Sequence, residues 1–145
     1  MCLAVYLASD QPLPLIAWNE QAPGFHVDAL AKDDQAVIRQ FQMAYVCYMG
    51  AHTFCGCGFQ SEPYRQYDNQ SISRTQEEES RLQLAQYLEQ RLRGGAQLQI
   101  FACWEGDQER TPEERRTLSP IEISAPDFYF HELELIEVVE RNGVP

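Results

Sequence analysis

The chain has 145 residues, of which 44% are hydrophobic and 11% aromatic, so it is long enough to bury a core and too apolar to be disordered. Its formal net charge is −11 and Lys32 is its one lysine, which predicts repulsion from nucleic acids and from anionic membranes. No stretch approaches the roughly 20 apolar residues of a membrane-spanning helix. We therefore expect a single acidic domain over residues 1–145, with no nucleic-acid or membrane partner.

The first half of the chain predicts several short strands. Segment 2–8 is almost continuously apolar, which is typical of a central strand buried on both faces. Asp33 or Asp34 can cap a short helix that ends near Phe41. Further extended segments are expected at 15–18, 25–27 and 44–49. His26 is expected to be a half-exposed polar residue.

The strongest single prediction is a helix over Gln76–Arg93. Thr75 and Glu78 have the spacing of a capping box, and Gly94-Gly95 follows the last turn. The polar segment 60–74 before it is expected to be a long surface loop. The apolar stripe of the helix is predicted to consist of Leu82, Ala85, Leu88 and Leu92.

The last third predicts two strands with short helical pieces between them. Segment 97–104 alternates as a strand, and the capping-box pattern Thr111-Pro112-Glu113-Glu114 predicts a short helix. Ser119-Pro120-Ile121-Glu122 predicts one more helical turn, and 128–139 the last strand. The glutamates of that strand can bind a cation, but a solvated face or sheet edge is the simpler interpretation of Glu132, Glu134 and Glu137.

These elements together predict an α+β fold. We expect a mixed, mainly antiparallel sheet of about five strands, with the Gln76–Arg93 helix on one face. The order of the strands does not follow from the sequence.

The chemistry of the chain is concentrated in segment 50–59, which reads GAHTFCGCGF. The Cys-x-Cys pair in extended conformation points both thiols to one side, and the glycines let the backbone wrap a small ion. Zinc needs about four nitrogen or sulfur ligands. The sequence therefore suggests a zinc site at His52, Cys55 and Cys57, with Cys103 as the fourth ligand if its strand lies beside the loop.

Three other interpretations of this segment stay open. The cysteines can be small buried hydrophobic residues of a glycine-rich hairpin. Cys55 and Cys57 can form a strained, labile disulfide or a reactive thiol pair beside His52. A hydrolytic site would need Cys55 or Cys57 as nucleophile, His52 or His131 as base, and glycine N–H groups as oxyanion donors.

The five cysteines are odd in number, which is unlike a secreted disulfide framework. No Lys or Arg precedes the apolar run at the N-terminus, so we expect no signal peptide and a cytoplasmic protein with reduced thiols. Cys2 would be a nucleophile of the N-terminal amidotransferase type only after removal of Met1, which precedes it in the sequence, and we do not expect this role. We expect Cys2 and Cys47 to be buried strand residues.

Three segments together resemble a group of short uncharacterised bacterial proteins: MCLAVYLAS at 1–9, CGCGF at 55–59 and FACW at 101–104. The resemblance covers most of the chain and implies no assigned activity. Two classes of function therefore remain. One is a thiol site, metal-binding or redox, at His52, Cys55, Cys57 and Cys103. The other is a non-enzymatic, acidic interaction domain with structural cysteines, as a homodimer in one form of the hypothesis.

Overall fold

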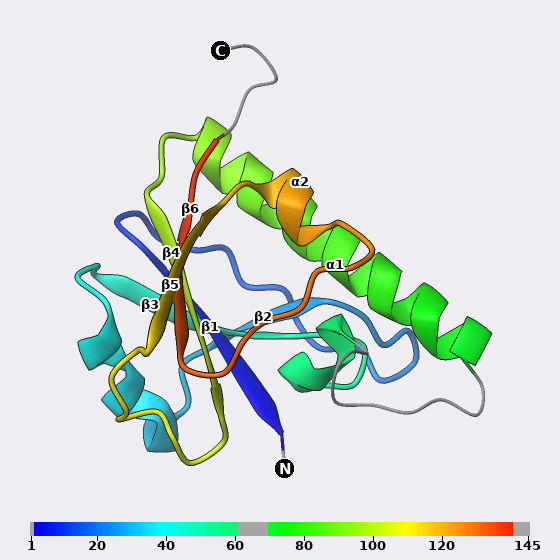
Figure 1. The fold of residues 1–145 in the computed structure, drawn as a ribbon, viewed down its shortest axis with the longest axis horizontal. Coiled ribbons are helices and arrows are strands. Elements are labelled where there is room, and N and C mark those ends of the chain that lie inside the picture. The colour runs from blue at the N-terminus through cyan, green and yellow to red at the C-terminus, as the bar shows by residue number, and fades with distance from the viewer. Residues whose placement is uncertain (1, 61–69, 141–145) are drawn as a thin grey trace.

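The computed structural model describes residues 2–60 and 70–140, and for 70–74 the backbone alone. It confirms an α+β fold with a mixed, mainly antiparallel sheet and one long helix, with six strands where about five were expected (Figure 1). The elements are, in chain order, β1 (Leu3–Ser9), β2 (His26–Ala29), the 3-10 helix η1 (Lys32–Gln40), β3 (Tyr45–Gly50), the 3-10 helix η2 (Gly56–Phe59), α1 (Gln70–Arg93), β4 (Leu98–Trp104), β5 (Glu114–Leu118), α2 (Pro120–Ile123) and β6 (Glu134–Val138).

The strand order is β2-β3-β1-β4-β6-β5, which places β1 inside the sheet as predicted. β1 pairs antiparallel with β3 on one side and with β4 on the other. Among the strands that the structure describes, β5 and β6 form the one parallel pair. Segment 15–18 contributes only one isolated bridge, between Ile16 and Val27.

Side chains of β1 alternate between two hydrophobic cores. Leu3, Val5 and Leu7 face the core that α1 covers, and Ala4, Tyr6 and Ala8 face a smaller core beneath η1. Figure 1 shows the two layers, with α1 and η1 on opposite sides of the sheet. Both faces of β1 are thus removed from water, which explains its nearly continuous apolar sequence.

The long helix begins earlier than predicted. α1 starts at Gln70, so Thr75 lies inside the helix and does not cap its N-terminus. No proline or glycine separates Gln70 from Thr75, so nothing in this segment stops the helix from extending. The loop predicted for 60–74 is correspondingly wrong at its C-terminal end, and its 61–69 portion lies outside the described residues.

The buried face of α1 is also partly different from the predicted stripe. Leu84 and Leu88 are fully buried and Ala85 nearly so, but Leu82 is 50% exposed. Leu92 packs at the margin of the core. The prediction missed Leu84, because Leu82 and Leu84 lie about 200° apart on a helix and only one of them can face the sheet.

Three local predictions near the C-terminus have different outcomes. The helical turn at Ser119 is confirmed as α2, with Ser119 and Glu122 forming a capping box. The short helix after Thr111 is wrong, since this segment forms β5 and its backbone pairs with β6. The solvated face is wrong for Glu134, which is fully buried beside Arg116, whereas Glu132 and Glu137 are exposed.

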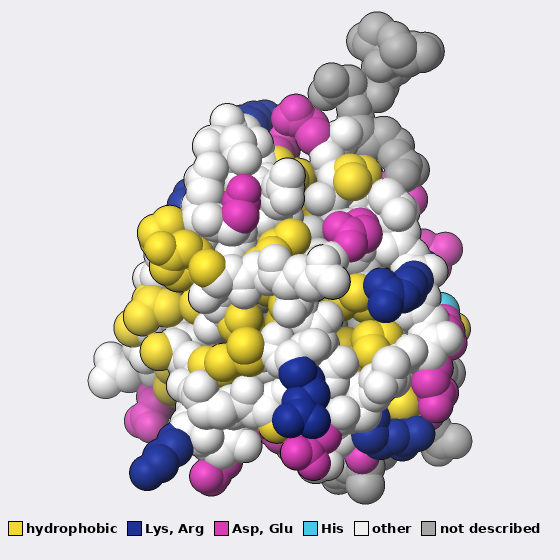
Figure 2. Space-filling model, turned by 90° about the vertical axis from the view of Figure 1, so that its left-hand side faces the viewer, with side chains coloured by type: hydrophobic (Ala, Val, Ile, Leu, Met, Phe, Trp, Pro, Cys, Tyr) yellow, Lys and Arg dark blue, Asp and Glu magenta, His cyan; other side chains and the backbone are white. Residues whose placement is uncertain are grey.

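The surface carries charges of both signs. On the face shown in Figure 2, apolar side chains gather toward the left, and basic and acidic groups are interspersed around them. The negative net charge is therefore not a uniform acidic patch on this face. Within residues 2–60 and 70–140, no helix has both the length and the apolar character of a membrane span.

Replacement of Leu88 by alanine tests the packing of α1. Leu88 is 0% exposed in the main core, so Leu88→Ala should lower the free energy of unfolding by about 2–5 kcal/mol. The matched control is Leu82→Ala on the same helix, where a 50% exposed side chain should cost no more than about 0.5 kcal/mol. Denaturant unfolding of both variants measures this, and equal losses would contradict the assigned face.

Candidate functional site

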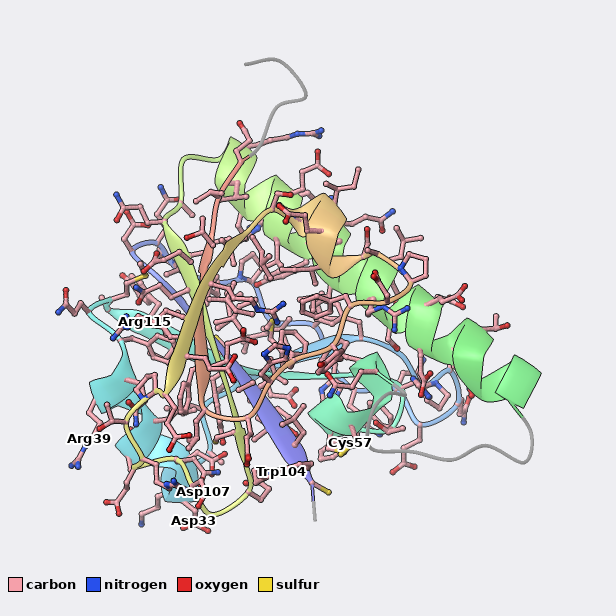
Figure 3. All side chains as sticks on the ribbon, in the orientation of Figure 1. Asp33, Arg39, Cys57, Trp104, Asp107 and Arg115 are labelled. Atoms are coloured by element: carbon pink, nitrogen blue, oxygen red, sulfur yellow. The ribbon has the colours of Figure 1, made fainter. Side chains whose placement is uncertain are left out.

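Three cysteine sulfurs meet at the end of the sheet where β1 begins. The Sγ atoms of Cys2, Cys55 and Cys57 all lie within 4.8 Å of one another. Cys2 immediately precedes β1, and Cys55 and Cys57 belong to the turn that leads through η2. Figure 3 shows Cys57 at this end of the sheet. Trp104, the β4 residue that pairs with Leu3, lies at the same end.

Gly56 brings the turn against β1. A Cβ atom at this position would lie 2.6 Å from Val5 Cγ2 and 2.9 Å from the carbonyl oxygen of Leu3. Only glycine therefore fits without displacing the strand or the turn. This close approach is what carries Cys55 and Cys57 to the position of Cys2.

The start of the turn is held by a buried histidine. His26 is 0% exposed, which corrects the expectation of a half-exposed residue. Its Nε2 donates to the carbonyl oxygen of Phe54 at 2.9 Å, and its Nδ1 lies 2.9 Å from Asp28 Oδ2. Phe54 has φ +74°, a left-handed conformation that costs a non-glycine residue on the order of 1–3 kcal/mol. The contact with His26 helps to hold Phe54 in this conformation directly before Cys55.

The end of the turn is fixed by side chains that bind backbone groups. Gln60 Nε2 donates to the carbonyl oxygen of Phe130 at 3.2 Å, and Gln60 Oε1 accepts from the Phe130 N–H at 2.6 Å. Arg81 Nη1 on α1 donates to the carbonyl oxygen of Phe59 at 2.7 Å. The turn is therefore anchored at both ends by groups other than the cysteines.

Contacts among the three cysteines shift their pKa values in different directions. Hydrogen bonding to the side chain and the backbone of Cys57 lowers the pKa of Cys55 to about 5, although burial opposes this. The same contact, together with burial, raises the pKa of Cys57, and contact with Cys55 raises the pKa of Cys2. In the metal-free group, negative charge is therefore favoured on Cys55 over Cys2 and Cys57.

One further backbone donor binds a sulfur, and a hydroxyl group lies near another. The Leu3 N–H donates to Cys57 Sγ at 3.1 Å. The Thr53 hydroxyl lies 3.8 Å from Cys55 Sγ and donates to the Cys55 carbonyl oxygen at 3.0 Å. A backbone donor such as the Leu3 N–H favours a sulfur that carries negative charge.

Cys2 is the member of the group that the sequence did not predict. It was expected to be a buried strand residue, but it is exposed and precedes the first residue of β1. Nothing in its own neighbourhood along the chain points to a site, because its partners come from another part of the sequence.

His52 and Cys103 do not belong to the group of three sulfurs. His52 turns toward α1, where its Nδ1 lies 3.1 Å from Ser80 Oγ and its backbone N–H donates to the same oxygen at 3.2 Å. Cys103 lies in the core beneath η1, opposite the face on which Cys57 packs, and burial raises its pKa to about 12. Cys47 is buried, as expected.

A second group of ligand-type residues is formed by Glu114, His131 and Glu134. His131 Nδ1 lies 2.7 Å from Glu114 Oε2, so the structure does not bring His131 to the thiols. Arg116 Nη2 donates to Glu134 Oε1 at 2.8 Å and its Nε donates to the other oxygen. The buried carboxylate is thus already neutralised, and we assign this group to the packing of β5 on β6.

No protein-family model, curated protein or solved structure matches the chain. The chemistry of the thiol group must therefore be inferred from its own geometry.

Replacement of Gly56 by alanine tests the close approach to β1. The added methyl group would meet Val5 Cγ2 at 2.6 Å, so Gly56→Ala should cost about 1–3 kcal/mol of unfolding free energy. Gly94→Ala is the control, since its nearest contact would be 3.4 Å, to the Arg91 carbonyl oxygen. A thermal melt in which Gly56→Ala is as stable as the wild type would show that the turn does not touch the strand.

The pH dependence of alkylation tests the charge distribution. Because the pKa of Cys55 is lowered to about 5, its thiolate should react with iodoacetamide at about pH 6.5 and lose reactivity only as the pH falls through about 5. Cys103, whose pKa is raised to about 12, should stay unlabelled at that pH. Peptide mass spectrometry of metal-free protein identifies the labelled residue, and Cys55→Ser is the control. Preferential labelling of Cys57 would contradict the assignment.

Proposed function

We propose that the chain is a metal-binding protein that holds a zinc ion through the thiolates of Cys2, Cys55 and Cys57. The observation that carries the proposal is the meeting of these three sulfurs within 4.8 Å of one another. Cys55 and Cys57 were predicted as ligands, and Cys2 takes a place that the sequence had suggested for His52 or Cys103.

The spacing of the sulfurs fits a thiolate-bound ion. Zinc binds thiolates at about 2.3 Å, which in tetrahedral geometry separates neighbouring sulfurs by about 3.8 Å. Sulfurs that all lie within 4.8 Å can reach this spacing through small side-chain rotations. Zinc and other soft ions select thiolates, whereas magnesium and calcium select oxygen ligands.

The hydrogen bonds support the same proposal. A bound ion replaces the shared protons of the three thiols, and the Leu3 N–H remains as a donor to Cys57 Sγ. Donors of this kind orient metal ligands and reduce the negative charge on sulfur.

The surroundings favour an ion over an organic substrate. A hollow of about 440 Å³ lies between α1 and α2, and one of about 250 Å³ lies beside His52 and Ser80. Neither is lined by any of the three cysteines. All five cysteines are free, which fits the reducing cytoplasm in which we place the protein.

A thiol redox function is the second candidate, and the lowered pKa of Cys55 favours it. The Cys55 thiolate would attack a small-molecule disulfide and release one thiolate, leaving a mixed disulfide. The Cys2 sulfur, after losing its proton to solvent, would then attack the Cys55 sulfur and release the second small thiolate. The protein would gain a Cys2–Cys55 disulfide, and the small disulfide would be reduced to two thiols.

Metal content of the purified protein tests the proposed function. Protein prepared under reducing conditions without chelator should contain about one zinc ion per chain, because one group of three thiolates can hold one ion. Cys57→Ser should weaken zinc binding by at least about tenfold. Loss of a residue that only supports a ligand already costs about tenfold or more, and Cys57 is proposed as a ligand itself.

Cys103→Ala is the matched control for this experiment, since Cys103 is a free, buried thiol of the other core. Its zinc content should equal that of the wild type. Absence of zinc in the wild type, with a reversible disulfide at Cys55, would favour the redox function. Absence of both would leave the interaction domain as the better hypothesis.

A further inference from the structure

The three-cysteine site leaves one position of a tetrahedral ion without a protein ligand. In the part of the chain that the structure describes, no fourth His, Cys, Asp or Glu shares the 4.8 Å grouping of the three sulfurs. The nearest candidate in sequence, His52, directs Nδ1 and its backbone N–H to Ser80. Structural zinc sites have four protein ligands, whereas sites with three keep the fourth position for water or an exchanging ligand.

The three thiols lie at the surface. Cys2 is exposed, and Cys55 and Cys57 are half-buried. The ring of Phe54, immediately before the pair, is 52% exposed and lies against the rings of Trp18 and His26. An external ligand can therefore approach an ion at this site without any movement of the sheet.

The site also does not depend on an ion for its shape. Gly56 packs directly on β1, His26 binds the carbonyl of Phe54, and Gln60 binds both backbone groups of Phe130. These contacts fix the turn on both sides of the cysteine pair. An ion can consequently leave without unfolding the segment that held it, unlike the ion of a zinc finger.

From these three observations we infer that the site is an exchange site, in which a thiolate from outside the chain completes the coordination of the ion and carries it in or out. This inference rests on the proposed metal site and goes further by naming the exchanging partner as a thiol. In the exchange, the external thiol loses its proton to solvent, its sulfur bonds to the ion, and a water ligand leaves. Transfer is completed when the three cysteines release the ion and the group regains the protons that ion binding had displaced, with no change in oxidation state.

Cobalt substitution tests the inference, because Co²⁺ reports the number of thiolate ligands through its charge-transfer absorption. Co²⁺-loaded protein should show three thiolates, and a neutral monothiol such as 2-mercaptoethanol should raise the charge-transfer intensity by roughly one third, as a fourth thiolate binds. Imidazole, a harder nitrogen ligand, should leave this charge-transfer band unchanged. The same monothiol should speed the transfer of Zn²⁺ from the protein to a chromophoric chelator.

His52→Ala is the decisive variant, since it should leave the cobalt spectrum and the response to the monothiol unchanged. A cobalt spectrum that does not change when the monothiol is added, or that changes in His52→Ala, would overturn the inference. The protein itself would then supply all four ligands of the ion. Loss of the far-UV circular dichroism signal on chelation would also overturn it, because the ion would be structural. Failure to bind either Co²⁺ or Zn²⁺ is a different result and overturns the proposed metal site itself.

Discussion

The backbone of Gly56 lies so close to β1 that even a methyl group would meet Val5 Cγ2 at 2.6 Å, and the thiol group depends on this contact. β1 is fixed in turn by pairing on both edges and by burial of both faces, so it is a rigid surface for the turn to rest on. Because the turn reaches the strand at its first residues, Cys55 and Cys57 come to lie beside Cys2. One glycine thus connects the centre of the fold with its most reactive residues.

How much of the site could be predicted depends on which constraint brings each residue there. The spacing of Cys55 and Cys57 was sufficient to place these two sulfurs together, because only one residue separates them. Cys2 could not be added, since its approach depends on the strand order, which the sequence does not state. Once β4 is paired with β1, Cys103 lies opposite Ala4, whose side chain faces the smaller core, so alternation separates it from Cys57.

For the fold, long periodic segments were predictable and local cap signals were less so. The apolar run of β1 and the burial of Leu88 follow from pattern alone, and both are confirmed. The capping-box residues at 75 and 111 failed for different reasons. Thr75 lies in a segment that continues helical on both sides. The segment after Thr111 gains backbone hydrogen bonds along one edge by pairing with β6. The solvated face predicted for Glu134 is wrong for a third reason, because Arg116 on the neighbouring strand pairs with this carboxylate and allows it to be buried.

The wide separation of Cys2 from its partners sets an order of events during synthesis. Leu3, the residue after Cys2, donates to the sulfur of a cysteine 54 positions later. At roughly 5–20 residues per second, a ribosome needs about 3–11 seconds to make that stretch. During this interval Cys2 lacks the two sulfurs that lie beside it in the folded chain. The three sulfurs can meet only after β3 and the turn that follows it have been made and placed against β1, so the complete thiol group marks a chain that has passed this stage.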